Sequence, residues 1–141
     1  MILLIIATLV VIALAVVFFR GTPPPLDPTT PEGVVQAYSS AVIDGDTAAA
    51  QAFLTQELQD NCDRVDNGML GGIRVTLVST KLASDTAHVR VSVVTNDNGG
   101  PFGGSDYATD DVFALVKANG SWAIETAPWQ LTICYNNKGN Q

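Results

Sequence analysis

The chain has 141 residues, with 14 acidic and seven basic side chains and a net charge of −7 at neutral pH. Phosphate backbones repel a chain this acidic, so the composition argues against nucleic acid as a partner. Once an apolar N-terminal run is set aside, the remaining length is enough for one domain with a single core and too short for two.

The N-terminal run of residues 1–19, MILLIIATLVVIALAVVFF, has no charged side chain, and its only polar side chain is that of Thr8. As a helix it would span about 28 Å, close to the hydrocarbon thickness of a bilayer. The alternative is a cleaved signal peptide. However, no Lys or Arg precedes the run, and Phe18, Phe19 and Arg20 stand where cleavage needs small residues. No Cys closes the run as a lipid-modified N-terminus would require. We predict a transmembrane anchor over residues 1–20.

The orientation of this anchor depends on two conflicting observations. Arg20 on the downstream side favours a cytoplasmic domain by the positive-inside rule. Cys62 and Cys134, a lone pair in a small domain, instead predict one disulfide and an oxidising compartment. Two ordinary buried thiols are the alternative. We give the cysteines more weight and predict a single-pass protein of the cell membrane with its domain on the extracytoplasmic side.

Helix signals fill the first part of the domain. Residues 21–29 carry four prolines and predict an extended linker. Thr30 then caps a helix that begins at Pro31, has one apolar face and is ended by Gly45. Asp46 caps a second helix, Thr47 to about Leu54, and a third short turn runs to Cys62. Two to three helices are therefore expected.

After a connection at residues 63–72, strand signals replace the helix signals. Alternating apolar residues around positions 73–78 and 87–93 predict two antiparallel strands, and a Gly-rich loop follows at 96–106. Further strands are expected at 107–117, 121–126 and 129–135, with Asn119-Gly120 as a type I′ turn. This order predicts an α+β domain over residues 30–137 and a tail at 138–141.

The segment 30–54, TPEGVVQAYSSAVIDGDTAAAQAFL, and the hairpin 119–124, NGSWAI, resemble nuclear transport factor 2-like domains. The resemblance implies a curved antiparallel sheet wrapped around the helices to leave a conical pocket. Members of this superfamily, which includes ketosteroid isomerase and polyketide cyclases, use the pocket for catalysis or small-molecule binding, or use the domain only for association. The resemblance supports the fold far better than it supports a function.

By this resemblance, Tyr38 stands where ketosteroid isomerase places its oxyanion-hole tyrosine. That mechanism also needs an Asp base and a protonated acid. Asp60, Asp63 and Asp66 are the nearby base candidates, none in a matching motif, and residues 112–116 of the third strand contain no acid. A packed core tyrosine is the more frequent role for such a residue.

Other candidate residues concern ligands and partners. Tyr38, Trp122 and Trp129 are candidates to line a pocket for a small apolar ligand. Phe102, between glycines, is a candidate partner contact. Asp97, Asp106, Asp110 and Asp111 surround the same loop, but their spacing is not that of an EF-hand. His88, the only histidine, is expected to be solvated. We therefore predict no metal and no cofactor.

Three functions remain open on the sequence. The first is a non-catalytic accessory or interaction subunit of a larger bacterial membrane protein complex, with other membrane-protein subunits and the membrane as partners. Ala7, Thr8, Ala13 and Ala15 could pack against another transmembrane helix. The second is a sensor or binding domain for a small apolar ligand. The third is an isomerase-like enzyme that uses the conical pocket.

Overall fold

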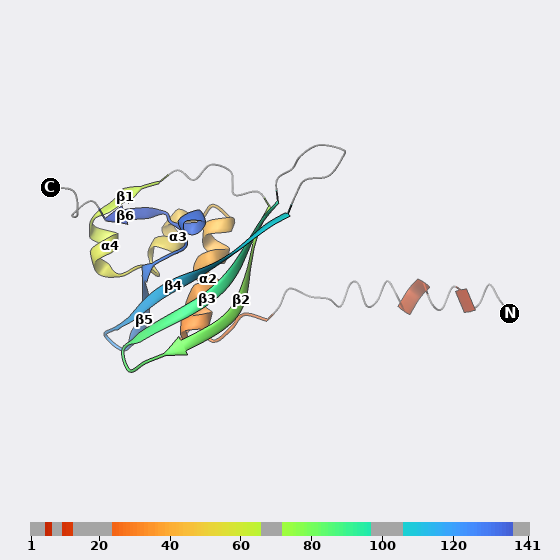
Figure 1. Ribbon diagram of the computed structural model, residues 1–141, viewed down its shortest axis with the longest axis horizontal. Coiled ribbons are helices and arrows are strands. Elements are labelled where there is room, and N and C mark those ends of the chain that lie inside the picture. The colour runs from red at the N-terminus through yellow and green to blue at the C-terminus, as the bar shows by residue number, and fades with distance from the viewer. Residues whose placement is uncertain (1–4, 7–9, 13–23, 66–71, 97–105, 137–141) are drawn as a thin grey trace.

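The computed structural model describes residues 5–6, 10–12, 24–65, 72–96 and 106–136, and helices precede strands along the chain (Figure 1). The helices are α2 (Pro31–Ile43), α3 (Thr47–Gln51) and α4 (Gln56–Asp60). The later elements are β1 (Cys62–Arg64), β2 (Ile73–Leu82), β3 (Thr86–Asn96), β4 (Asp106–Ala118), β5 (Ser121–Thr126), the 3₁₀ turn η2 (Trp129–Leu131) and β6 (Cys134–Asn136). The prediction of an α+β domain is confirmed.

The helix starts follow from side-chain caps. The Thr30 hydroxyl accepts a hydrogen bond from the Gly33 amide at 3.1 Å, and the Asp46 carboxylate accepts one from the Ala49 amide at 3.0 Å. Each bond satisfies an amide that a helix N-terminus leaves unpaired. Gly45 separates the two helices with a φ of +76°, in the left-handed region that glycine adopts at no steric cost.

The second helix is shorter than predicted, because it ends at Gln51 and not near Leu54. Its expected last residues pair with a strand instead. The Ile124 amide donates to the Phe53 carbonyl at 2.8 Å, and the Thr55 amide donates to the Ile124 carbonyl at 2.9 Å. A parallel bridge between Leu54 and Ile124 thus replaces helical bonds that local propensity favours.

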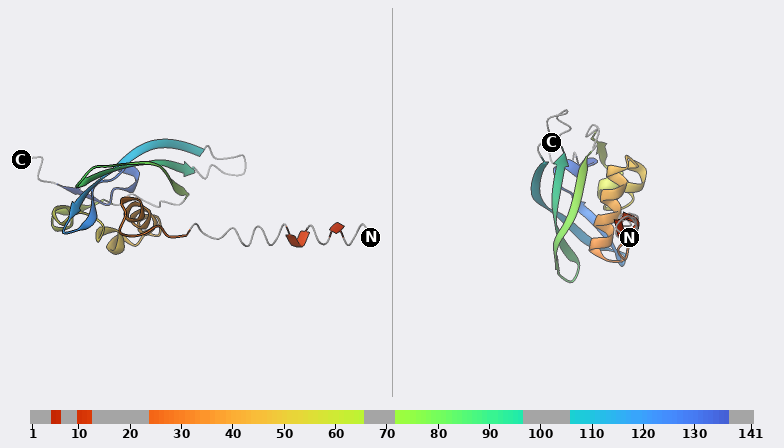
Figure 2. Two further views of the ribbon diagram at one scale, coloured as in Figure 1. Left: turned by 90° about the horizontal axis from the view of Figure 1, so that it is seen from below. Right: turned by 90° about the vertical axis from the view of Figure 1, so that its right-hand side faces the viewer.

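Four antiparallel strands in the order β2-β3-β4-β5 form the main sheet, and the helices cover one of its faces (Figure 2). Inward positions of β3 and β4, such as Val89 opposite Phe113, alternate with exposed ones, as expected for a sheet with one buried face. Asn119 and Gly120 both have positive φ, 53° and 83°, which confirms the tight turn between β4 and β5. The face that the helices cover contains the core.

The last part of the chain differs from the prediction of a strand over 129–135. Residues 129–131 form a 3₁₀ turn closed by a bond from the Leu131 amide to the Pro128 carbonyl at 2.9 Å, and only Cys134–Asn136 is a strand. β6 pairs with β1. The third helical turn, predicted to run to Cys62, ends at Asp60, and β1 occupies Cys62 and the start of the predicted connection. Neither short strand has the alternation that makes longer strands recognisable.

The predicted disulfide is confirmed. Cys62 and Cys134 are bonded across a sequence separation of 72, and their Cα atoms are 4.8 Å apart. The bond joins the first residue of β1 to the first residue of β6. It therefore ties the end of the helical segment to the end of the domain.

The predicted anchor lies mostly outside the described residues. Its described parts, residues 5–6 and 10–12, are helical and exposed. Across the portions of the chain that the structure describes, no helix has both the length and the apolar character needed to cross a bilayer. The first part of the linker and the tail at 138–141 are also outside the described residues, whereas residues 24–27 are described and adopt no regular structure.

Candidate functional site

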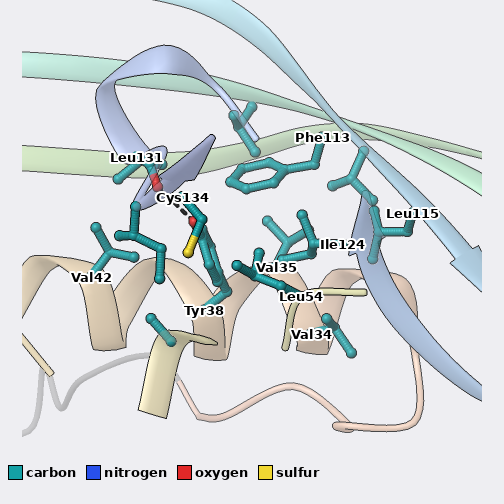
Figure 3. Close-up of a cluster of buried hydrophobic side chains, with 14 of the residues drawn as sticks. Val34, Val35, Tyr38, Val42, Leu54, Phe113, Leu115, Ile124, Leu131 and Cys134 are labelled. Atoms are coloured by element: carbon teal, nitrogen blue, oxygen red, sulfur yellow. Dashed lines mark hydrogen bonds between the residues drawn. The ribbon is translucent and has the colours of Figure 1, made fainter. Parts of the chain in front are cut away.

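Tyr38 lies at the centre of the core, where α2 faces the sheet (Figure 3). Its ring meets the ring of Phe113 edge to face, with centroids 5.9 Å apart and an interplanar angle of 82°. Its hydroxyl donates a hydrogen bond to the Leu131 carbonyl at 2.7 Å. The side chain is fully buried, so the hydroxyl that the resemblance offers for catalysis is used to hold the C-terminal segment.

A small cavity of about 230 Å³ lies beside Tyr38. Its apolar walls include Leu54, Leu58 and Ile133, and among the residues that line it Glu125 supplies a carboxylate. Glu125 itself is exposed to solvent. An isomerase-like mechanism needs a base and an acid that converge with the tyrosine hydroxyl on one substrate. No such convergence with Tyr38 is present among the described residues.

Burial raises the pKa of Tyr38 well above its ordinary value. The folded protein therefore stabilises the neutral phenol. This contribution is complete below the unfolded pKa of about 10 and is lost as the pH rises above it, because the unfolded chain then releases a proton that the folded chain retains.

We expect the substitution Tyr38→Phe to have two effects on stability. It should lower the free energy of unfolding at neutral pH by about 1–3 kcal/mol, because the Leu131 carbonyl loses its buried donor. It should also remove part of the loss of folding stability at alkaline pH. For this group that loss reaches about 1.4 kcal/mol per pH unit above pH 10. Urea unfolding of both proteins between pH 7 and pH 11 measures both effects. If the free energies of unfolding of the two proteins changed with pH in parallel, the proposed role of Tyr38 would be wrong.

The structure does not bring the three candidate aromatics to one cavity. Trp122 is partly buried and lines a separate cavity of about 270 Å³ with Val34 and Phe53, and the Lys117 ammonium lies 5.6 Å from its ring centroid. Trp129 on η2 is 69% exposed. Only Tyr38 lies beside the cavity in the core.

The acidic candidates are also dispersed. Asp106 accepts a hydrogen bond from the Asn96 amide group at 2.7 Å, and Asp110 lies 4.0 Å from Arg90. The carboxylate of Asp60 accepts from Gln56 on α4. Within the described residues no cluster of His, Cys, Asp or Glu could hold a metal ion.

The remaining candidates are placed as follows. Asp63 lies on β1 opposite Tyr135, and Asp111 lies on β4 opposite Val91. His88 is exposed on β3, opposite Lys81. Asp66, Asp97 and Phe102 lie outside the described residues.

The sequence did not predict a larger groove between α2 and β2, with a volume of about 710 Å³. Val35, Ser39 and Ile43 line it from the helix, and residues 74–77 line it from the strand. The groove exists because β2 is the edge strand beside α2 (Figure 2). Strand order is not readable from apolar periodicity, so no local pattern could have revealed it.

The chain was compared with models of known protein families, and one of them matches most of it. The family model described as lipoprotein LpqB, N-terminal domain, matches residues 24–138. The chain belongs to this family. The matched region begins after the apolar run and includes every element of the domain. The two cysteines of the sequence are joined in the disulfide, so neither sulfur is free for a lipid while that bond is intact. No curated protein matches the chain.

Three solved structures are similar to the chain at low sequence identity. A SEC-C motif containing protein from Rhodopseudomonas palustris is 13% identical, with a TM-score of 0.52 over 72% of this chain and 79% of its own. A variant of a protein called Rd1NTF2_05 is 16% identical, with a TM-score of 0.49 over 67% and 90% of the two chains. A putative ketosteroid isomerase from Shewanella frigidimarina is 18% identical, with a TM-score of 0.45 over 65% and 88%. The helices-then-sheet order that the nuclear transport factor 2-like resemblance implies is present in the chain.

Proposed function

We propose that this chain is a non-catalytic, membrane-associated domain that acts outside the cytoplasm as an interaction subunit of a larger bacterial membrane assembly. Membership of a lipoprotein family supports the membrane association, and the apolar run 1–19 is its proposed anchor. The disulfide supports an oxidising compartment.

The observation that carries the proposal is the use of Tyr38 in the core. Its hydroxyl holds the Leu131 carbonyl, and its ring packs on Phe113. The interior position at which the resemblance would place a reactive group therefore serves packing. The adjacent cavity, about 230 Å³, is below the roughly 300–1,000 Å³ typical of ligand pockets. Association through the surface is the use of the fold that these features favour.

Among the residues that the structure describes, Trp129 is well suited to such an association. It is 69% exposed, although its segment is fixed by the η2 turn, by bonds from the Thr132 hydroxyl to the carbonyls of Ala127 and Pro128, and by the disulfide at Cys134. An exposed tryptophan on a rigid support loses little conformational entropy on binding. Tryptophan is also among the residues most enriched at energetically dominant interface positions.

In-membrane photo-crosslinking tests this proposal. A photoreactive p-benzoylphenylalanine replaces Trp129 in one variant and Tyr107 in the other, and the two native side chains are 69% and 70% exposed. We expect position 129 to give a discrete product with another membrane protein, and position 107 to give much less of it. Lipid adducts alone at position 129 would contradict a protein contact there. Equal yields at both positions would show that exposure alone explains the reaction.

A further inference from the structure

The groove between α2 and β2 has features of a peptide site that the core cavity lacks. Its walls are mostly apolar, with Val35 and Ile43 on the helix and Val75 and Leu77 on the strand. Leu26 also lines it and is held against the helix, since its amide donates to the side-chain oxygen of Gln36 at 2.6 Å. The groove is therefore bounded by α2, by the segment around Leu26 and by β2.

That strand has a free edge. β2 pairs with β3 on one side, and no described strand lies on its other side. The pairing of β2 with β3 is regular over Ile73–Leu77 and is interrupted by an irregularity between Leu77 and Ser79. The regular half is the half that lines the groove. Edge strands present unpaired amides and carbonyls that can pair with another extended chain.

The polar groups of the groove define the chemistry of its occupant. Arg74 is exposed and lines the groove, and it forms no ion pair within the described residues. Ser39 is 4% exposed, and its hydroxyl has no hydrogen-bond partner among these residues. A buried unpaired hydroxyl is costly, and an exposed guanidinium is complementary to a carboxylate. The groove thus combines apolar walls, a cation and an unused polar group.

We infer that the groove receives an extended segment of a partner protein, which adds to the β2 edge as a further strand. Its alternate apolar side chains fill the space between α2 and β2, and a carboxylate on it faces Arg74. The inference rests on the proposed role in association, but it uses a different surface from that of Trp129. It assigns a kind of partner, an extended apolar segment with an acid, to this part of the domain.

The test uses a fluorescent Val-Thr-Val-Glu-Val peptide and the full chain in detergent micelles, with binding followed by fluorescence anisotropy. We expect saturable binding, and a loss of about ten-fold in affinity when the peptide's amides are N-methylated, because strand addition needs those donors. Replacing the peptide's Glu with Lys should also weaken binding. The substitution Arg74→Glu should reverse the preference between the two peptides.

Two leucine variants of the protein provide a matched comparison. Leu26→Lys places a charge in the groove, and Leu82→Lys places one at the end of β2, outside the groove. The two native residues are 40% and 66% exposed. Only Leu26→Lys should weaken binding, by about ten-fold. Circular dichroism checks that both variants are folded. If the Leu26→Lys variant does not fold, Arg74→Glu provides an independent test of the groove.

Several results would overturn the inference. Equal binding of the N-methylated peptide would indicate an apolar pocket without strand addition. If the peptide did not bind, or if both leucine variants lowered its affinity equally, the groove would not be the binding site. Self-association that Leu26→Lys abolishes and the peptide does not compete with would make a second copy the occupant. If the peptide fails while cross-linking at position 129 persists, the proposed function stands without this site.

Discussion

Loss of the disulfide should lower the free energy of unfolding by about 4 kcal/mol, since the bond closes a long loop in the unfolded chain. Cys62 and Cys134 are 72 positions apart, and loop-closure entropy rises with that separation. Domains of this size have a total stability of roughly 5–15 kcal/mol. Urea unfolding of the Cys62→Ala/Cys134→Ala double variant of the full chain in detergent micelles measures the loss.

Reduction of the unchanged protein is the control for that experiment. A reductant opens the same loop without altering packing, so the reduced protein and the double variant should have similar midpoints. A difference between them would measure the packing of the cysteine side chains, of which Cys134 is 6% exposed. If both retained the midpoint of the oxidised protein, the disulfide would not stabilise this domain.

The substitution Phe113→Ala should cost about 3–5 kcal/mol, the usual range for removing a buried aromatic ring. Phe113 is fully buried on the inner face of β4, and its ring is the edge-to-face partner of Tyr38. The change leaves a cavity in the centre of the core and removes the contact that orients the tyrosine. Chemical unfolding compared with the unchanged chain gives the value.

Val112→Ala is the matched control because Val112 is the preceding residue on the same strand. Its side chain points to the opposite face of the sheet and is 39% exposed. We expect a loss below about 1 kcal/mol for this variant. Similar losses for the two variants would show that strand propensity, and not the buried ring, determines the effect.

The sequence predicts the elements of this fold well where the signal is local, such as a helix cap, a turn pair or a regular alternation of apolar and polar residues. The caps at Thr30 and Asp46, the alternation at 73–78 and 87–93 and the Asn119-Gly120 turn all act locally, and the structure contains each of them. The disulfide was predictable because the sequence has only two cysteines. These features need no knowledge of the tertiary arrangement.

Features that depend on distant partners were not predictable. α3 ends early because Leu54 bridges to Ile124, and β1 and β6 exist because they pair with each other. The candidate site shows the same limit. The sequence indicates that Tyr38 is a core aromatic, but its bond to Leu131 joins residues 93 positions apart. The groove beside β2 likewise depends on the order of the strands.

We propose that the chain functions as an interaction subunit of a membrane assembly, and mild solubilisation of native membranes tests this proposal. The untagged chain is separated by size, and the proteins that co-migrate with it are identified by mass spectrometry. We expect the chain to migrate as a complex with another membrane protein in a constant ratio. Migration as a free monomer, with no co-migrating protein, would contradict it.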